Sequence, residues 1–259
     1  MPLVQIFRSS TRWFLVVPAL LLILSNISVA STGSGDVRTT TYVGIFAGSA
    51  LTENRLIDVD GFANWGNPGW VSYYEDSGFI SGALIGNKFD INDVPLRIEI
   101  DISPGNISAE TNQLDPFGLD ETAKSDYEWI ITARAGIEKT IGRVTIFATG
   151  GIAGSRLVNS VTDIDFGPTI PMHVDNDDSF QDKLVEHGWV LGAGVETAIA
   201  DAWLLRLEAS YIDFGRRTYF VNLSGNNSCG RGNPRRPCPY KVENKLGSVR
   251  LMFIHRFGQ

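Results

Sequence analysis

Polar and apolar residues alternate along several segments of this chain, and this alternation restricts the fold more than any other feature. Between residues 96 and 103, every even position is Leu or Ile and every odd position is Arg, Glu, Asp or Ser. Segments 129–138, 203–211 and 248–257 follow similar patterns. Residues two apart face the same side of a β-strand, so these segments are predicted as strands with one apolar face.

Four further segments, 41–50, 78–89, 143–155 and 186–200, alternate more weakly and are rich in glycine. The eight segments are about 9–11 residues long or slightly longer, the length of a membrane-spanning strand. Short connections follow the second, fourth and sixth segments, whereas long ones lie at 51–77, 104–125, 156–185 and 215–240. Compact soluble domains rarely contain loops this long, but outer-membrane barrels combine short periplasmic turns with long extracellular loops.

The predicted fold is therefore all-β: an eight-stranded antiparallel transmembrane β-barrel with short periplasmic turns and four long extracellular loops. Alternation alone would also fit a secreted sandwich or a lipocalin-like barrel. Trp129, Trp203, Tyr211 and Phe257 lie at the ends of apolar stripes, as the aromatic girdles of a membrane barrel do. A mean hydropathy of +0.00 fits a barrel whose lipid-facing residues alternate with polar ones.

The first thirty residues are predicted to be a cleaved signal peptide, which leaves residues 31–259 as the barrel domain. Arg8 and Arg12 precede an apolar run at 13–24, and the segment ends with Ser-Val-Ala at 28–30. This order is typical of secretory signals, and the run is too short for a membrane anchor. The expected location is the cell outer membrane.

The charge balance and the cysteines limit which partners and which kinds of site the chain is expected to have. The chain has 22 Lys and Arg against 29 Asp and Glu, a net charge of −7, so nucleic acid is not an expected partner. Cys229 and Cys238, the two cysteines, bracket a Gly- and Pro-rich loop. In a secreted protein this spacing favours a local disulfide, with a metal pair or free thiols as the alternatives.

The stretch 192–215, Gly-Ala-Gly-Val-Glu-Thr-Ala-Ile-Ala-Asp-Ala-Trp-Leu-Leu-Arg-Leu-Glu-Ala-Ser-Tyr-Ile-Asp-Phe-Gly, resembles the sixth and seventh strands of opacity-protein-like and OmpA-like outer-membrane barrels. Residues 78–86 and 96–101 are similar to their second and third strands. The resemblance covers residues 31–259 and implies a surface protein of a Gram-negative bacterium, commonly a structural protein, antigen or adhesin. Such barrels often end on a Phe that the barrel assembly machinery reads, whereas here Gly258 and Gln259 follow Phe257.

A set of charged residues is predicted to face the lumen. Its members are Arg97, Glu99, Asp101, Glu128, Arg134, Glu196, Arg206, Glu208 and Arg250. An eight-stranded barrel is just wide enough for side chains to fill it, and buried charges must be paired. We therefore expect a salt-bridged plug, and the alternative is a narrow porin-like ion channel.

Specific contacts are expected in the long loops. Trp65, Trp70, Tyr73 and Tyr74 are either a contact surface for a host or surface ligand or aromatic side chains packed at the barrel rim and lipid headgroups. In the fourth loop, the candidates for contact with lipopolysaccharide phosphates are arginines: Arg216, Arg217, Arg235 and Arg236. The third loop is rich in Asp but lacks the Gly and the distal Glu of a calcium loop, so no metal site is expected.

No catalytic site or cofactor is expected. His173, His187 and His255 are scattered through the chain without a local catalytic motif, so a lipid A-modifying enzyme is the least favoured reading. A structural or adhesive surface protein and a minor pore remain as the two main alternatives.

Overall fold

The computed structural model of the chain describes residues 39–59, 68–91, 94–105, 107–114, 119–167, 170–220 and 239–257. These residues form nine strands: β1 Thr39–Asp58, β2 Trp70–Ile91, β3 Val94–Ser103, β4 Ile107–Leu114, β5 Leu119–Ile141, β6 Val144–Gly167, β7 Ile170–Ala200, β8 Trp203–Phe220 and β9 Pro239–Phe257. Within these ranges, none of the chain forms a helix long and apolar enough to cross a membrane. The expected signal peptide, residues 1–30, lies outside the described residues.

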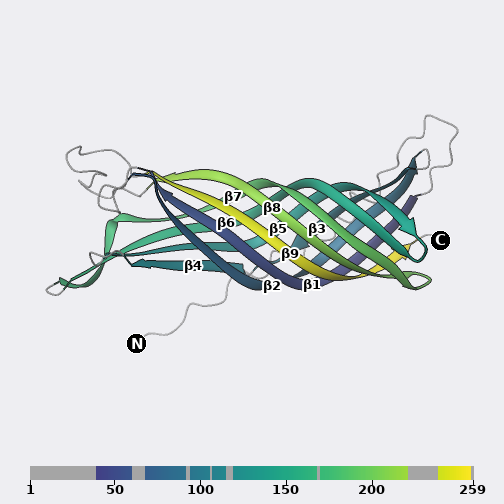
Figure 1. Cartoon of the computed structure of the whole chain (residues 1–259), viewed down its shortest axis with the longest axis horizontal. Coiled ribbons are helices and arrows are strands. Elements are labelled where there is room, and N and C mark those ends of the chain that lie inside the picture. Colours follow the sequence, from purple (N-terminus) through teal and green to yellow (C-terminus); the bar gives the residue numbers. More distant parts are fainter. Residues whose placement is uncertain are drawn as a thin grey trace, which may run out of the picture. The chain divides into compact units, whose positions relative to one another are not determined.

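The strands close into a ring of eight antiparallel members (Figure 1). β1 pairs with β2 on one side and with β9 on the other, so the first and last strands complete the barrel. β3 and β4 both pair with β5, one after the other, and together they occupy a single place in the ring. The predicted all-β, eight-stranded barrel is confirmed.

The strands are longer than the alternation predicted, and the four connecting segments are correspondingly shorter. β6 runs to Gly167 and β7 starts at Ile170, so most of the segment expected to be the third loop is a β-hairpin. The expected second loop contains β4 and the start of β5. The sheet continues because inward-facing apolar residues such as Leu56 and Val242 remain buried beyond the lipid-facing stripe. The short connections expected at 139–142 and near 201 are present as turns at 142–143 and 201–202.

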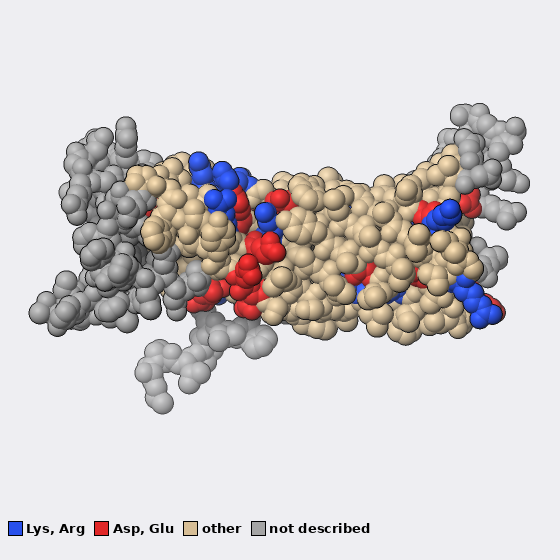
Figure 2. Space-filling model, in the orientation of Figure 1, with Lys and Arg blue, Asp and Glu red and all other residues tan. Residues whose placement is uncertain are grey.

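The outer wall has an apolar belt bounded by charged residues. On β9, the outward side chains of Phe253, Leu251 and Val249 are exposed, whereas Glu243, further from the C-terminus, pairs with Arg55. Figure 2 shows a broad band with few charged atoms between two zones of charge. We call the charged ring above the belt the collar, made up of Arg55, Lys124, Asp126, Glu128, Arg156, Lys183, Arg216 and Glu243.

The ladder of the barrel wall is interrupted between β2 and β4. β2 pairs with β3 from Ala83 to Ile91, but among the described residues no ladder pairing joins its 75–82 portion to β4. The interruption starts at Pro104, which has no amide hydrogen, and at Gly105, which has a φ of 69°. We call the boundary between β2 residues 75–82 and β4, where the described part of the chain shows no ladder pairing, the seam.

Candidate functional site: the interior of the barrel

Ten charged side chains cross the lower part of the lumen, toward the end where β9 terminates. We call this set the charge layer: five cations, Lys88, Arg97, Arg134, Arg206 and Arg250, and five carboxylates, Glu99, Asp101, Glu138, Glu196 and Glu208. They come from six strands. Each one points inward because alternate residues of a strand face the same side, and it lies on the side that faces the lumen. The formal charges within the layer cancel.

Arg134 is a central member of the charge layer. Its guanidinium donates hydrogen bonds to Glu208 at 2.6 Å, to Asp101 at 2.9 Å and to Glu99 at 3.2 Å. Arg250 also pairs with Asp101 and Glu208. The carboxylates therefore have several cationic partners each, which compensates for the cost of removing them from water.

Aromatic rings complete the packing around the guanidinium groups. The Phe147 ring lies 4.0 Å from the guanidinium carbon of Arg97 and 4.9 Å from that of Arg206. This ring occupies the space beside Gly194, where an added Cβ would lie 2.6 Å from a ring carbon. Glycine at this position therefore lets the ring approach the strand closely and face the cations, an arrangement that is favourable electrostatically.

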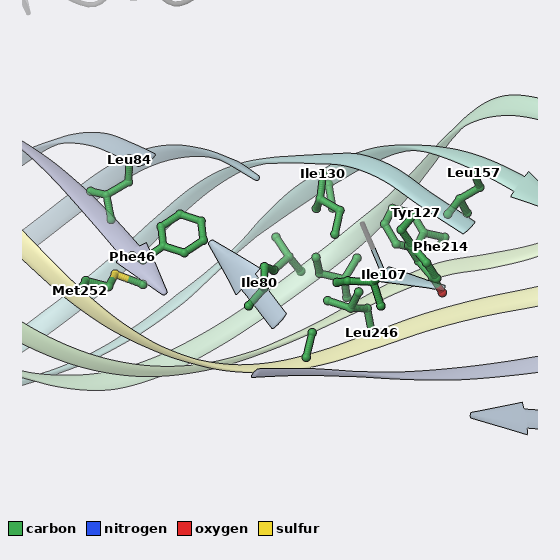
Figure 3. Packing of buried hydrophobic residues seen from close by; sticks show 14 of the residues in the cluster. Phe46, Ile80, Leu84, Ile107, Tyr127, Ile130, Leu157, Phe214, Leu246 and Met252 are labelled. Carbon is green, nitrogen blue, oxygen red and sulfur yellow. The ribbon is translucent and has the colours of Figure 1, made fainter. Parts of the chain in front are cut away.

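A layer without charges lies above the charge layer. Its members, the apolar layer, are Ala50, Ile80, Ile107, Ile130, Ala153, Leu157, Ile212, Phe214 and Leu246, all buried. Figure 3 shows Ile107, Ile130 and Leu246 near one another inside the strands, apart from Phe46, Leu84 and Met252. On β9, the inward stripe places Leu246 between Arg250 and Asn244. The lumen is therefore not uniformly polar, and this was not expected from the sequence.

A neutral hydrogen-bonded group follows the apolar layer. We call Asn54, Ser125, Tyr127, Asn159 and Asn244 the amide layer. The Asn244 amide nitrogen donates to Asn54 Oδ1 at 2.9 Å and to Ser125 Oγ at 3.0 Å. The Tyr127 hydroxyl also donates to Asn54 Oδ1, at 2.8 Å. The members of the amide layer come from four strands, β1, β5, β6 and β9, so the amide layer fixes the cross-section of the barrel at this level.

Buried aromatic residues lie beyond the amide layer. Phe180 stacks on Tyr219 with ring centroids 5.4 Å apart and is tilted against Tyr240 at the same centroid separation. Burial, together with the adjacent Glu186 carboxylate, raises the pKa of Tyr219 above its ordinary value. Arg217 donates a hydrogen bond to Glu186, and this bond raises the pKa of Arg217. The upper lumen is thus also filled with side chains.

Eight of the nine residues expected to face the lumen lie in the charge layer, and the expectation for Glu128 is wrong. A β-bulge between Tyr127 and Trp129 shifts the register of β5 against β6. Tyr127 and Ile130 therefore point inward, while Glu128 pairs with Arg156 and Lys183 on the outer wall. Lys88 and Glu138 were not among the expected members, although both lie an even number of positions from inward-facing residues of their strands.

The structure also revises the expected loop contacts. Tyr74 is an inward residue of β2 whose hydroxyl hydrogen-bonds with Ser125, so its assignment to an exposed loop is wrong. Trp70 and Tyr73 are exposed on the same strand. Arg216 and Arg217 lie in β8 rather than in a loop, and they pair with Glu243 and Glu186. The other expected residues lie outside the described part of the chain: Trp65, Cys229, Arg235, Arg236 and Cys238.

The described side chains contain no group of three or more His, Cys, Asp or Glu residues placed to hold a metal ion. His255 packs edge-on between Trp203 and Phe257, with ring centroids 4.8 Å away in both cases. This aromatic group lies at the end of the barrel that carries the short turns. His255 is therefore part of the rim packing.

Comparison with known proteins agrees with this architecture. The chain is 32% identical over 146 residues to 31 kDa outer-membrane immunogenic proteins of Brucella melitensis and Brucella suis, which is 54% of this chain and 55% of theirs. It thus spans about half the length of these curated relatives.

Two solved structures are similar at low identity. OprG from Pseudomonas aeruginosa has 13% identity and a TM-score of 0.48, with 85% of this chain and 97% of that one covered. Neisserial surface protein A has 12% identity and a TM-score of 0.32, with 82% and 97% covered. The outer membrane protein beta-barrel domain family matches residues 19–233, most of the chain. The chain therefore belongs to the outer membrane protein beta-barrel domain family, and its location is the outer membrane.

Proposed function

We propose that this chain is a structural protein of the outer-membrane surface, with an antigenic or adhesive role at its extracellular end and a lumen closed to ions. The observation that carries the closed lumen is the order of buried layers on the inward stripe of β9. Arg250, Leu246 and Asn244 belong to the charge, apolar and amide layers in turn. An ion would have to pass all three layers.

Each layer opposes ion passage for a different physical reason. The charge layer holds neutralised ion pairs and leaves no net charge to attract a permeant ion. The apolar layer offers no hydrogen bonds to replace the hydration shell of an ion, and hydrophobic constrictions of this kind exclude water. The amide layer is joined across the lumen by hydrogen bonds among Asn54, Asn244 and Asn159.

The surface role is supported by the wall beyond the collar. β6 and β7 continue past Arg156 and Lys183 to a hairpin at Gly167 and Ile170. Such extensions would hold antigenic segments clear of the lipid. In this proposal, this end is extracellular, because the short turns of outer-membrane barrels are periplasmic. The Brucella relatives are named as immunogenic outer-membrane proteins, which also supports an antigenic role.

The partners in this proposal are outer-membrane lipid and lipopolysaccharide, a host or surface ligand at the extracellular end, and the barrel assembly machinery. The assembly signal would be the end of β9, where Phe257 is exposed on the outer wall next to His255. Replacing Phe257 by Ala should lower the amount of heat-modifiable barrel in the outer membrane. An unchanged amount would argue against a role for this side chain.

The closed lumen is tested in planar bilayers. We expect the refolded wild-type barrel to give no reproducible conductance steps. The double variant R250A/L246A, which thins two layers on β9, should conduct more than either single variant. Reproducible wild-type channels would overturn the closed lumen and favour the alternative, a narrow porin-like pore.

The surface role is tested separately on intact cells. Protease added outside should cleave segments between β1 and β2, β6 and β7, or β8 and β9, and should leave the turn at Gly142 intact. A gel-mobility shift on heating would report the closed barrel in the same samples. Cleavage limited to cells with permeabilised outer membranes would contradict the proposed orientation.

A further inference from the structure

We propose that Arg156 and Lys183, arranged around Glu128 on the outer wall, bind a phosphate group of the lipid A part of lipopolysaccharide. Arg156 Nη1 lies 3.5 Å from Glu128 Oε2, and Lys183 pairs with the other carboxylate oxygen. Their side chains remain 40% and 51% exposed. Both cations are therefore held in place and still open to a ligand. We call these three residues the clamp.

The β-bulge in β5 creates the clamp. Regular alternation would place Glu128 in the lumen with Arg134, but the register shift between Tyr127 and Trp129 turns it to the outer wall. There it meets Arg156 of β6 and Lys183 of β7, so three neighbouring strands contribute one residue each. Two cations around one carboxylate leave a formal charge of +1, which favours an anionic ligand.

The clamp lies where the apolar belt ends. On β6, the outward residue four positions below Arg156 is Ile152, and on β7 the residues below Lys183 include Val185 and Trp189, all exposed. A lipid whose acyl chains cover these residues would bring its headgroup to the level of Arg156 and Lys183. Basic residues at this boundary attract anionic lipid headgroups.

The choice of lipid A follows from the side of the membrane, and so this step rests on the orientation in the proposed function. Lipid A occupies the outer leaflet and carries phosphate groups at the border of its acyl chains. Arg presents several donors to phosphate oxygens, and Lys adds a compact positive charge. Glu128 then has two roles, because it positions the cations before binding and competes with the phosphate for them.

The experiment is a titration of the detergent-refolded full-length barrel with purified lipopolysaccharide. We expect R156Q/K183Q to weaken binding about 30-fold, as the loss of two boundary cations predicts. The control K139Q/R143Q removes two exposed cations at the opposite, short-turn end, and it should leave the affinity unchanged. The E128Q variant should bind several-fold more tightly, because the competing carboxylate is gone.

Three results would overturn the clamp: equal losses in R156Q/K183Q and K139Q/R143Q, weaker binding by E128Q with the fold retained, or unchanged affinity for lipopolysaccharide whose lipid A has been dephosphorylated. Equal binding to phosphatidylglycerol vesicles would overturn the choice of lipid A. The titration does not depend on orientation or conductance, so its failure is distinguishable from failure of the proposed function, which the bilayer and protease experiments report.

Discussion

Arg206 of β8 donates a hydrogen bond to Glu99 of β3 at 2.5 Å, although the two strands lie four places apart in a ring of eight. The contact thus crosses the full width of the lumen. Both side chains are completely buried. This pair joins opposite walls directly, and so it should contribute strongly to the stability of the closed barrel.

Replacing Arg206 by Gln should destabilise the barrel by about 3–5 kcal/mol, because Glu99 and Glu196 would each lose a buried cationic partner. Urea unfolding in lipid vesicles, followed by gel mobility, measures this change. R143Q at an exposed turn is the matched control and should leave the midpoint unchanged. A midpoint for R206Q equal to that of R143Q would show that the cross-lumen pair adds no stability.

The apolar layer should be stabilising in the manner of a soluble core. Leu246 faces the lumen with 1% exposure, and Leu251 on the same strand faces outward with 48% exposure. L246A should cost about 2–5 kcal/mol because it leaves a cavity. L251A should cost less, because lipid fills the vacated space. The same unfolding assay compares them, and a larger loss for L251A would count against a packed interior.

A comparison of Gly105 with Gly142 separates two costs of adding a side chain to a glycine: the steric clash of its Cβ and the strain of a positive φ angle. Both have positive φ angles, 69° and 63°. An added Cβ at Gly105 would lie 2.3 Å from the Tyr127 carbonyl oxygen, whereas at Gly142 it would meet nothing within 4 Å. G142A should therefore lose about 1 kcal/mol from strain alone, and G105A clearly more. Equal losses would show that the break between β3 and β4 adjusts freely.

The seam should be visible in amide hydrogen exchange. Among the described residues, 75–82 of β2 have a ladder partner on the β1 side alone, so amides of this stretch that point toward β4 should exchange rapidly. Residues 52–58 of β1, which pair with both β2 and β9, are the control. Nuclear magnetic resonance in micelles resolves individual amides. Uniform protection along 75–82 would mean that the seam closes in solution.

The sequence predicted the fold well where one face of a strand is strictly polar. Residues 96–103 keep their alternation in the barrel, with Arg97, Glu99 and Asp101 buried and Ile98 on the outer wall. The alternation was easy to recognise because the two faces of a transmembrane strand differ in polarity: one contacts lipid and the other the polar lumen. The lengths of the strands were underestimated. Beyond the lipid, the outer face of each strand becomes polar, so the difference in polarity between its two faces no longer marks the strand.

The interior layers were harder to predict for two physical reasons. A β-bulge adds one residue to a strand without a distinctive composition, so nothing in the sequence indicated that Glu128 would leave the lumen. The apolar layer was hidden because Leu246 and Ile130 resemble the lipid-facing residues on neighbouring strands. Which apolar residue faces inward depends on register, and register depends on pairings between distant segments.

The neutrality of the charge layer bears on how the barrel assembles. β3 contributes one cation and two carboxylates, and β9, at the C-terminus, contributes Arg250, which pairs with Asp101 and Glu208. Without β9, an assembling sheet would carry an uncompensated negative charge into a medium of low dielectric constant. Charge compensation and ring closure therefore coincide. A truncated or stalled chain would be destabilised by this unpaired charge. Partly closed barrels should therefore be scarcely populated compared with the complete barrel.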